Sequence, residues 1–124
     1  MLTQQDTSAL ETDLAQFFCT DNWWKHWTGR INYTDGVKFL AEKAGAFWLI
    51  DLVASYQGAR LRQEEFQIWI LTVDREKTSM AVATCQADTN APVLVRQEID
   101  HTDFPLPSIK LWLVNGALML PSEY

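Results

Sequence analysis

The sequence predicts an α+β fold, with three N-terminal helical segments followed by a mainly antiparallel sheet of about five strands. Apolar residues recur at helical spacing over the first half of the chain, and from Phe66 they alternate at period two. Helices followed by a run of strands with short turns indicate a sheet packed by helices on one face. The 124 residues fit a single domain, 1–124, with a helical part at about 8–57 and a sheet part at about 66–120.

The first predicted helix begins at Ser8, which forms a capping-box pattern with Glu11. One face of this helix carries Leu10, Leu14, Phe17 and Phe18. The polar residues at 20–22 then break the pattern, and we expect them to cap a further short helical turn. This turn carries Trp23, Trp24, His26 and Trp27. Residues 29–33 are predicted to form a connector or a short extended piece.

The second predicted helix is capped by Thr34 or Asp35. Its apolar face consists of Val37, Leu40, Ala41 and Ala44. Gly45 is either the residue that ends this helix or a point of close packing. The third helical segment, 46–57, is apolar nearly all round, so we expect it to be buried on most sides until Gly58 ends it.

Five strands are predicted at 67–74, 79–87, 93–99, 109–114 and 117–120. The dipeptide Asn115-Gly116 lies between the last two and predicts a type I′ hairpin turn, which needs a positive φ at both residues. Residues 103–107 contain two prolines, which exclude a central strand, so we expect an irregular crossing there.

The charge distribution argues against nucleic-acid binding. The formal net charge is −6, and neither half of the chain is basic. The N-terminus has no signal-peptide pattern, and no apolar run approaches the ~20 residues that span a bilayer. We therefore expect a cytoplasmic protein without a membrane segment.

No motif in the sequence indicates a cofactor or a metal. Glycine-rich phosphate loops, a dinucleotide fingerprint and a nucleophile elbow are missing, and we predict no catalytic residue. Cys19 and Cys85 are too far apart in sequence for a redox motif and too few for a metal site. We expect two reduced thiols that pack as small hydrophobic side chains.

Asp51 is the most informative polar residue, because its neighbours in the third helical segment are apolar. A buried carboxylate there needs a partner, and it suits a general acid/base or a ligand anchor. The alternatives are a narrow exposed stripe with Ser55, or a carboxylate bonded to a loop or to an arginine. A candidate pocket combines Asp51 and His26 with three tryptophans, namely Trp24, Trp27 and Trp48. The tryptophans at 23–27 equally suit a hydrophobic anchor for the N-terminal helix.

The strands predict a second surface. Phe66, Ile68 and Ile70 alternate with Trp69, Leu71 and Val73, so both faces of this strand are apolar. An exposed apolar face usually marks a partner or an oligomer. We expect an interface anchored by Trp69, Leu71 and Trp112.

Several stretches together resemble a known family. They are YTDGVKFLAEKAGAFWLID at 33–51, DFPL at 103–106 and LPSEY at 120–124, with the tryptophan-rich stretch 23–27. They are similar to a small bacterial family, with cyanobacterial members, that is known as a domain of unknown function. The resemblance implies a stand-alone single-domain protein, and it transfers no catalytic or binding role.

We therefore expect a non-enzymatic interaction module that forms a homodimer or binds a protein partner through its sheet. The alternative is a small-molecule binder or enzyme that uses the tryptophan-lined pocket with Asp51 and His26.

Overall fold

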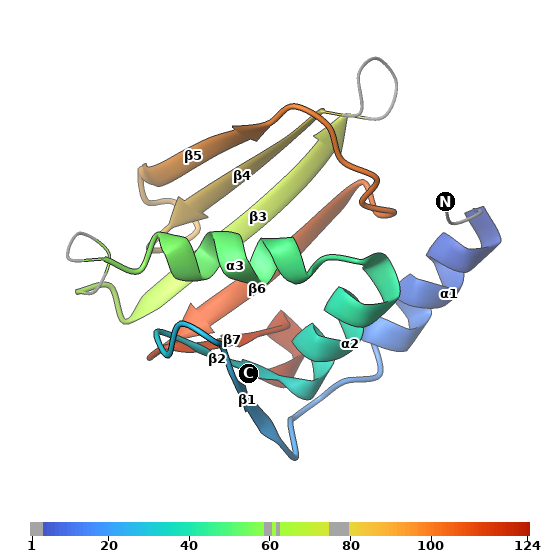
Figure 1. Ribbon diagram of the computed structural model, residues 1–124, viewed down its shortest axis with the longest axis horizontal. Helices are drawn as coiled ribbons and strands as arrows, with labels where there is room; N and C mark the ends of the chain where they lie inside the picture. Colours follow the sequence, from blue (N-terminus) through green and yellow to red (C-terminus); the bar gives the residue numbers. More distant parts are fainter. Residues whose placement is uncertain (1–3, 59–60, 62, 75–79) are drawn as a thin grey trace.

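The computed structural model describes residues 4–58, 61, 63–74 and 80–124. Its helices are α1 (Gln4–Leu14), α2 (Asp35–Ala44) and α3 (Phe47–Ser55), with a short 3-10 helix η1 (Pro121–Glu123) near the C-terminus. Helices α2 and α3 lie over one face of the sheet, and α1 packs beside α2 (Figure 1). No helix in these described ranges has the length and apolar character needed to cross a bilayer.

The sheet has seven strands in the order β1-β2-β7-β6-β3-β4-β5. All neighbours pair antiparallel except β2 and β7, which are parallel. The strands are β1 (Trp23–Lys25), β2 (Asn32–Thr34), β3 (Phe66–Asp74), β4 (Met80–Gln86), β5 (Val93–Ile99), β6 (Ser108–Val114) and β7 (Ala117–Met119). The α+β class is confirmed. The prediction of a sheet of about five strands, with all helices N-terminal to it, is wrong: β3 to β7 follow the helices as expected, but β1 and β2 precede α2 and bring the sheet to seven strands.

Residues 23–27 do not form the predicted helical turn. Trp23 to Lys25 form strand β1, in which Trp23 pairs with Thr34 of β2. Aromatic residues favour strands, and the pairing with β2 overrides the helical spacing. The predicted helix start at Ser8 is also wrong, because Ser8 lies inside α1 and its carbonyl accepts a hydrogen bond from the Thr12 hydroxyl.

The local signals around α2 and the last hairpin are confirmed. The Thr34 hydroxyl caps α2 by accepting a hydrogen bond from the Val37 N–H. Gly45 ends α2 with φ 62°, in the left-handed region. Asn115 and Gly116 have φ values of 50° and 83°, as the turn between β6 and β7 requires. Residues 103–107 contain no regular element.

The two faces of β3 differ in what covers them. Trp69 and Leu71 are buried in the core on the helix-covered face. They therefore do not contribute to an exposed interface, because the helices already cover them. The other side of the sheet, here called the outer face, carries Ile68 of β3 and its cross-strand partner Trp112 of β6.

Trp112 is half-buried in an aromatic cluster on the outer face. Its ring centroid lies 5.3 Å from that of Phe66 and 5.5 Å from that of Tyr124, the C-terminal residue. Trp112 remains a predicted interface residue, now without Trp69 and Leu71.

A buried carboxylate joins the end of the chain to the start of α2. Glu123 Oε1 accepts hydrogen bonds from the Thr34 hydroxyl at 2.6 Å and the Leu120 N–H at 3.0 Å, and Oε2 accepts one from the Gly36 N–H at 3.1 Å. An anion is favoured at a helix N-terminus, where the first N–H groups lack helical partners. This contact leaves no room at Gly36, where a Cβ atom would lie 2.5 Å from Glu123 Oε1 and 2.7 Å from Leu120 Cδ1.

We expect Gly36→Ala to destabilise the protein by about 1–3 kcal/mol, because the added methyl group displaces the bonded carboxylate. In an unobstructed helix the same change stabilises by about 1 kcal/mol, so the sign is diagnostic. Urea unfolding measures the effect. Gly58→Ala is the control, because a Cβ atom there has no neighbour within 4 Å. A stabilised Gly36→Ala variant would contradict the packing described here.

Candidate functional site

Two of the predicted pocket residues, His26 and Asp51, are in direct contact. His26 follows β1 in the turn toward β2, and Asp51 lies on α3. Their side chains meet with a distance of 2.6 Å from His26 Nε2 to Asp51 Oδ1. The imidazole is buried, whereas the Asp51 side chain is 52% exposed. Of the two interpretations of Asp51, the buried carboxylate is therefore wrong, and the residue lies on the alternative exposed helical stripe with Ser55.

The turn dictates the tautomer of His26. The backbone N–H of Thr28 points at His26 Nδ1 with a distance of 3.2 Å from nitrogen to nitrogen. Because a backbone N–H only donates, Nδ1 is the acceptor, and the proton lies on Nε2. The Nε2–H group then donates to Asp51. The Thr28 hydroxyl lies 2.8 Å from Nδ1 and completes the environment of the ring.

Trp27 shares the same carboxylate. Its indole N–H donates to Asp51 Oδ1 at 3.1 Å, and its ring centroid lies 5.3 Å from that of His26. Trp27 is nevertheless 81% exposed. The carboxylate therefore orients an indole whose faces remain open to solvent.

The other two predicted pocket residues lie elsewhere. The Trp24 indole N–H donates to Asp35 Oδ1 at 2.9 Å, and the Lys38 ammonium lies 4.4 Å from the centroid of the Trp24 ring. Trp48 is half-buried against the hydrophobic core. The structure therefore joins His26, Asp51 and Trp27 in one hydrogen-bonded group, whereas the Trp24 indole is bonded to Asp35 instead.

Asp35 holds Trp24 and also orders the chain that leads into the β1–β2 hairpin, residues 23–34. Its Oδ2 accepts hydrogen bonds from the backbone N–H groups of Asp21 and Asn22, at 3.1 and 3.3 Å. The hydrogen bond from Trp24 is the main cause that lowers the pKa of Asp35 below its usual 3.8, and the two backbone donors add to it. Asp35 was predicted only as a helix cap, and its role as an acceptor for Trp24 was not predicted.

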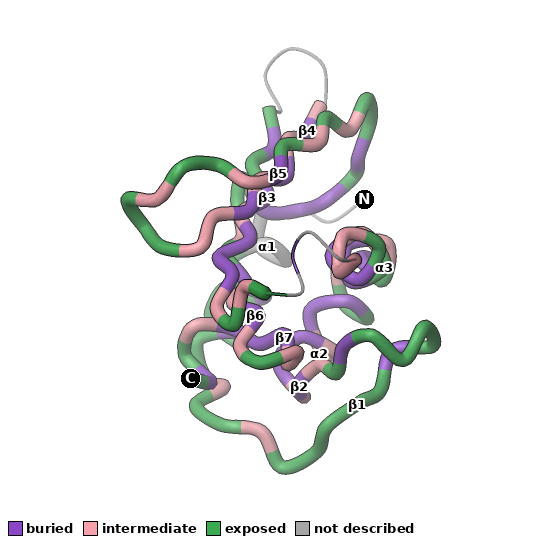
Figure 2. The backbone as a smooth tube through the Cα atoms, turned by 90° about the vertical axis from the view of Figure 1, so that its left-hand side faces the viewer, coloured by how far each residue is buried: buried purple, intermediate pink, exposed green. Residues whose placement is uncertain are grey.

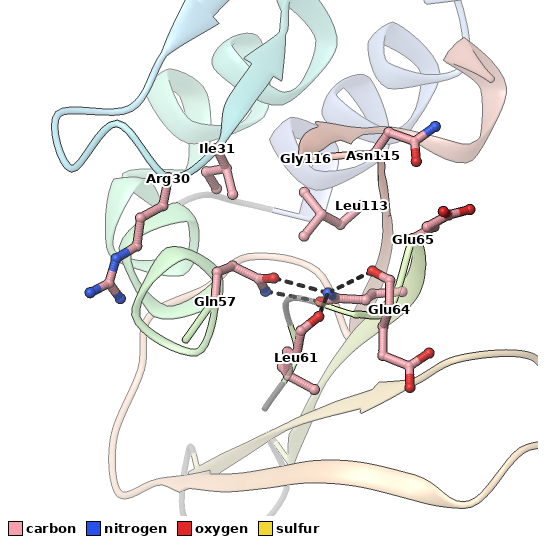
Figure 3. Close-up of a pocket in the computed structure, with 10 residues that line it drawn as sticks. Arg30, Ile31, Gln57, Leu61, Glu64, Glu65, Leu113, Asn115 and Gly116 are labelled. Carbon is pink, nitrogen blue, oxygen red and sulfur yellow. Dashed lines mark hydrogen bonds between the residues drawn. The ribbon is translucent and has the colours of Figure 1, made fainter. Parts of the chain in front are cut away.

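A cavity of about 280 Å³ lies beside the hairpin, between the end of α3 and the β6–β7 turn (Figure 3). Its wall includes Arg30 and Ile31, which follow Trp27 in the turn, but neither His26 nor Asp51 lines it. Figure 3 shows the guanidinium of Arg30 and the carboxylate of Glu65 turned toward the periphery. Gln57 and its hydrogen-bonding partner Gln67 both line the cavity.

The amides of Gln57 and Gln67 bond to each other. Each Nε2 donates to the other residue's Oε1 at 2.9 Å. Gln67 Oε1 also accepts the Trp69 indole N–H, and its Nε2 contacts the Leu61 and Glu64 carbonyl oxygens at 3.3 Å. This buried amide is fully satisfied, so its role is to tie the segment before β3 to α3. The sequence signal is the position of Gln67, which shares the inward face of β3 with Trp69.

The two cysteines do not meet. Cys85 is buried and Cys19 is exposed, and both thiols are free. Burial raises the pKa of Cys85 to about 12, so its thiol stays protonated at neutral pH. Across the residues with described positions, no group of three or more potential ligands is arranged to hold a metal ion.

We expect Asp35→Asn to lower stability at neutral pH and to have less effect in acid. The folded-state pKa of Asp35 lies below 3.8, so the ionised carboxylate stabilises the fold above that pH. The stabilisation is lost as the pH falls through the folded-state pKa. Urea unfolding from pH 7 down to pH 2 measures the difference between wild type and variant. Asp21→Asn is the control on the neighbouring exposed carboxylate. A difference that does not shrink in acid would contradict the assigned hydrogen bonds.

Comparison with known proteins gives one match. Residues 8–124 match the family described as "Family of unknown function (DUF6876)". No curated protein and no solved structure matches the chain significantly. The match covers nearly the whole chain, including the β1–β2 hairpin, α3 and Glu123, so the chain belongs to this family of unknown function.

Proposed function

We propose that the protein is a non-enzymatic interaction module that binds a protein partner through the aromatic hairpin. The aromatic hairpin consists of residues 23–34, which comprise β1, the turn and β2. The single observation that carries the proposal is that two of its indoles, Trp24 and Trp27, are held by carboxylates of α2 and α3 while their rings reach solvent.

The exposure of these tryptophans supports a contact role. Tryptophan is highly buried on average in folded proteins. Trp23 is 56% exposed and Trp27 81% exposed, so neither anchors the N-terminal helix. Figure 2 shows β1 exposed along its length at the periphery of the molecule. Exposed large aromatic side chains on one hairpin are typical of a surface that a partner covers.

The carboxylates make the hairpin suitable for binding. An indole whose N–H is already paired presents an apolar ring without an unsatisfied donor. Its orientation is also limited before binding, which reduces the conformational entropy lost in the complex. Lys25 lies between Trp24 and Trp27 in sequence, Arg30 follows Trp27, and both basic side chains are exposed. Tryptophan and arginine are the residue types most enriched at interface hot spots.

Binding of a small molecule is the alternative, and the exposed Trp27 indole beside the Asp51 carboxylate favours it. An exposed indole beside a carboxylate suits an organic cation. Two features of the site weaken this alternative. His26 and Asp51 are bonded to each other, and the Trp24 indole is bonded to Asp35 instead of Asp51.

We expect a Trp23→Ala/Trp27→Ala variant to lose partner binding by about tenfold or more, because truncation removes two central aromatic contacts. The measurement is affinity capture from the lysate of the native host, followed by titration of the captured protein against purified variants. Asp51→Ala should weaken binding less, because it frees the Trp27 indole without removing it.

Tyr124→Ala is the matched control, because Tyr124 is also a highly exposed aromatic residue but lies at the aromatic cluster of the outer face. It should bind as wild type does. Loss of binding in Trp112→Ala with retention in the hairpin variant would assign the interface to the outer face and contradict the proposal. A thermal shift with organic cations and no captured protein would favour the alternative.

A further inference from the structure

The sheet has two edges of different character. One edge is β1, which has three residues, and the other is β5, which has seven. Among the described residues, β5 pairs only with β4, and Figure 1 shows it at the free margin of the sheet. An unpaired edge presents a row of backbone donors and acceptors to which another strand can pair, and short strands, proline, β-bulges or charged side chains limit such pairing. Strand β5 contains no proline and one charge of each sign.

We propose that β5 is a self-association edge, where a second copy of this chain adds its own β5 antiparallel to form one continuous sheet. This inference concerns a surface other than the aromatic hairpin and does not rest on the proposed function. It follows from the register that β5 can form with itself.

Strand β5 is self-complementary about a two-fold axis that passes between Gln97 of one copy and Gln97 of the other. In this register Arg96 of one copy lies opposite Glu98 of the other, and Glu98 lies opposite Arg96. Within one chain these two residues form an ion pair, with 2.9 Å between Arg96 Nη1 and Glu98 Oε1. They share the outer face, because they pair with Thr84 and Val82 of β4. Opposite charges placed directly across strands stabilise an antiparallel pair.

The other face of the strand agrees with the same axis. Val95 of one copy lies opposite Ile99 of the other, so two apolar side chains meet on the helix-covered face. Their partners on β4 are Cys85 and Ala81, which belong to the core. The pairing therefore extends the core across the axis, because Ile99 is only half-buried in a single chain.

The side chain of Gln97 lies beside the axis, and a hydrogen bond already orients its amide group. Its Oε1 accepts a hydrogen bond from the Tyr56 hydroxyl at the end of α3. This bond leaves the Nε2 donors of Gln97 directed away from Tyr56, and no other side-chain bond of Gln97 occurs in the described chain. Two such amides facing each other across a two-fold axis can exchange hydrogen bonds, as amide side chains do elsewhere in this fold between Gln57 and Gln67.

The register matches the backbone as well as the side chains. Every pair in it joins residues separated by an even number of positions, so inward-facing residues meet inward-facing residues. The axis runs perpendicular to the sheet, and α3 of each copy lies on the same face of the joined sheet. In this register only residues 95–99 of each β5 pair with the second copy, which is a small interface, so we expect a dimer that dissociates on dilution.

Sedimentation of the full chain over a concentration series tests the proposal. Wild type should form a reversible dimer. Arg96→Glu and Glu98→Arg should each weaken the dimer by about tenfold, because like charges then face each other across the axis. Lys110→Glu is the control for a charge reversal on the outer face of β6, which β3 and β4 separate from β5, and it should not change the dissociation constant.

The decisive arm mixes the two single variants. The two negative positions of Arg96→Glu then face the two positive positions of Glu98→Arg, so a heterodimer should form more tightly than either homodimer. Within each variant chain, positions 96 and 98 still carry charges of the same sign. A gain in association in the mixture must therefore come from contacts between the two chains and not from a change within the monomer. Amide hydrogen exchange of residues 93–99 should slow with concentration in wild type. A wild-type monomer at all concentrations, or a dimer that the mixture does not restore, would overturn the proposal. Neither result affects partner capture by the hairpin.

Discussion

The carboxylate of Glu123 connects three parts of the fold that are distant in sequence. It bonds to Thr34, which ends β2 and caps α2, to Gly36 in the first turn of α2, and to Leu120, which follows β7. The same contact therefore positions the parallel pair β2–β7 and the start of the helix that covers it. Because α3 follows α2 after a short connection, and the aromatic hairpin ends in β2, the meeting of Trp27 with Asp51 depends on this one buried group.

Local chemistry explains which parts of the fold could be predicted from the sequence. The cap at Thr34, the end of α2 at Gly45 and the turn at Asn115-Gly116 each depend on residues within a few positions of one another, and all three were predicted. Strand β1 was predicted as a helical turn, and β2 only as a connector or a short extended piece, because β2 pairs with β7 some 85 positions away in sequence, as for Asn32 and Ala117. The Gly36–Glu123 contact spans 87 positions and has no periodic signal.

The candidate site shows the same division. His26 and Asp51 were both identified, because a polar residue in an apolar segment is visible in a sequence. Their contact, and the exposure of Asp51, depend on how α3 lies over the hairpin. The opposite faces of Trp69 and Trp112 follow from alternation and register, since Ile68 pairs with Trp112. Which face the helices cover is a tertiary property. If both proposals hold, β5 and the aromatic hairpin occupy opposite edges of one sheet, and a dimer through β5 would present two hairpins at its far ends.

The central claim is that the Glu123 carboxylate and the capping residue Thr34 act as one unit. A double-mutant cycle of Thr34→Val and Glu123→Ala, followed by urea unfolding, measures their coupling free energy directly. The account predicts a coupling of about 1–2 kcal/mol, because the bond between the two side chains is buried and involves a charged group. Effects that add within about 0.5 kcal/mol would contradict the account, because they would show that the end of the chain and the start of α2 are held independently.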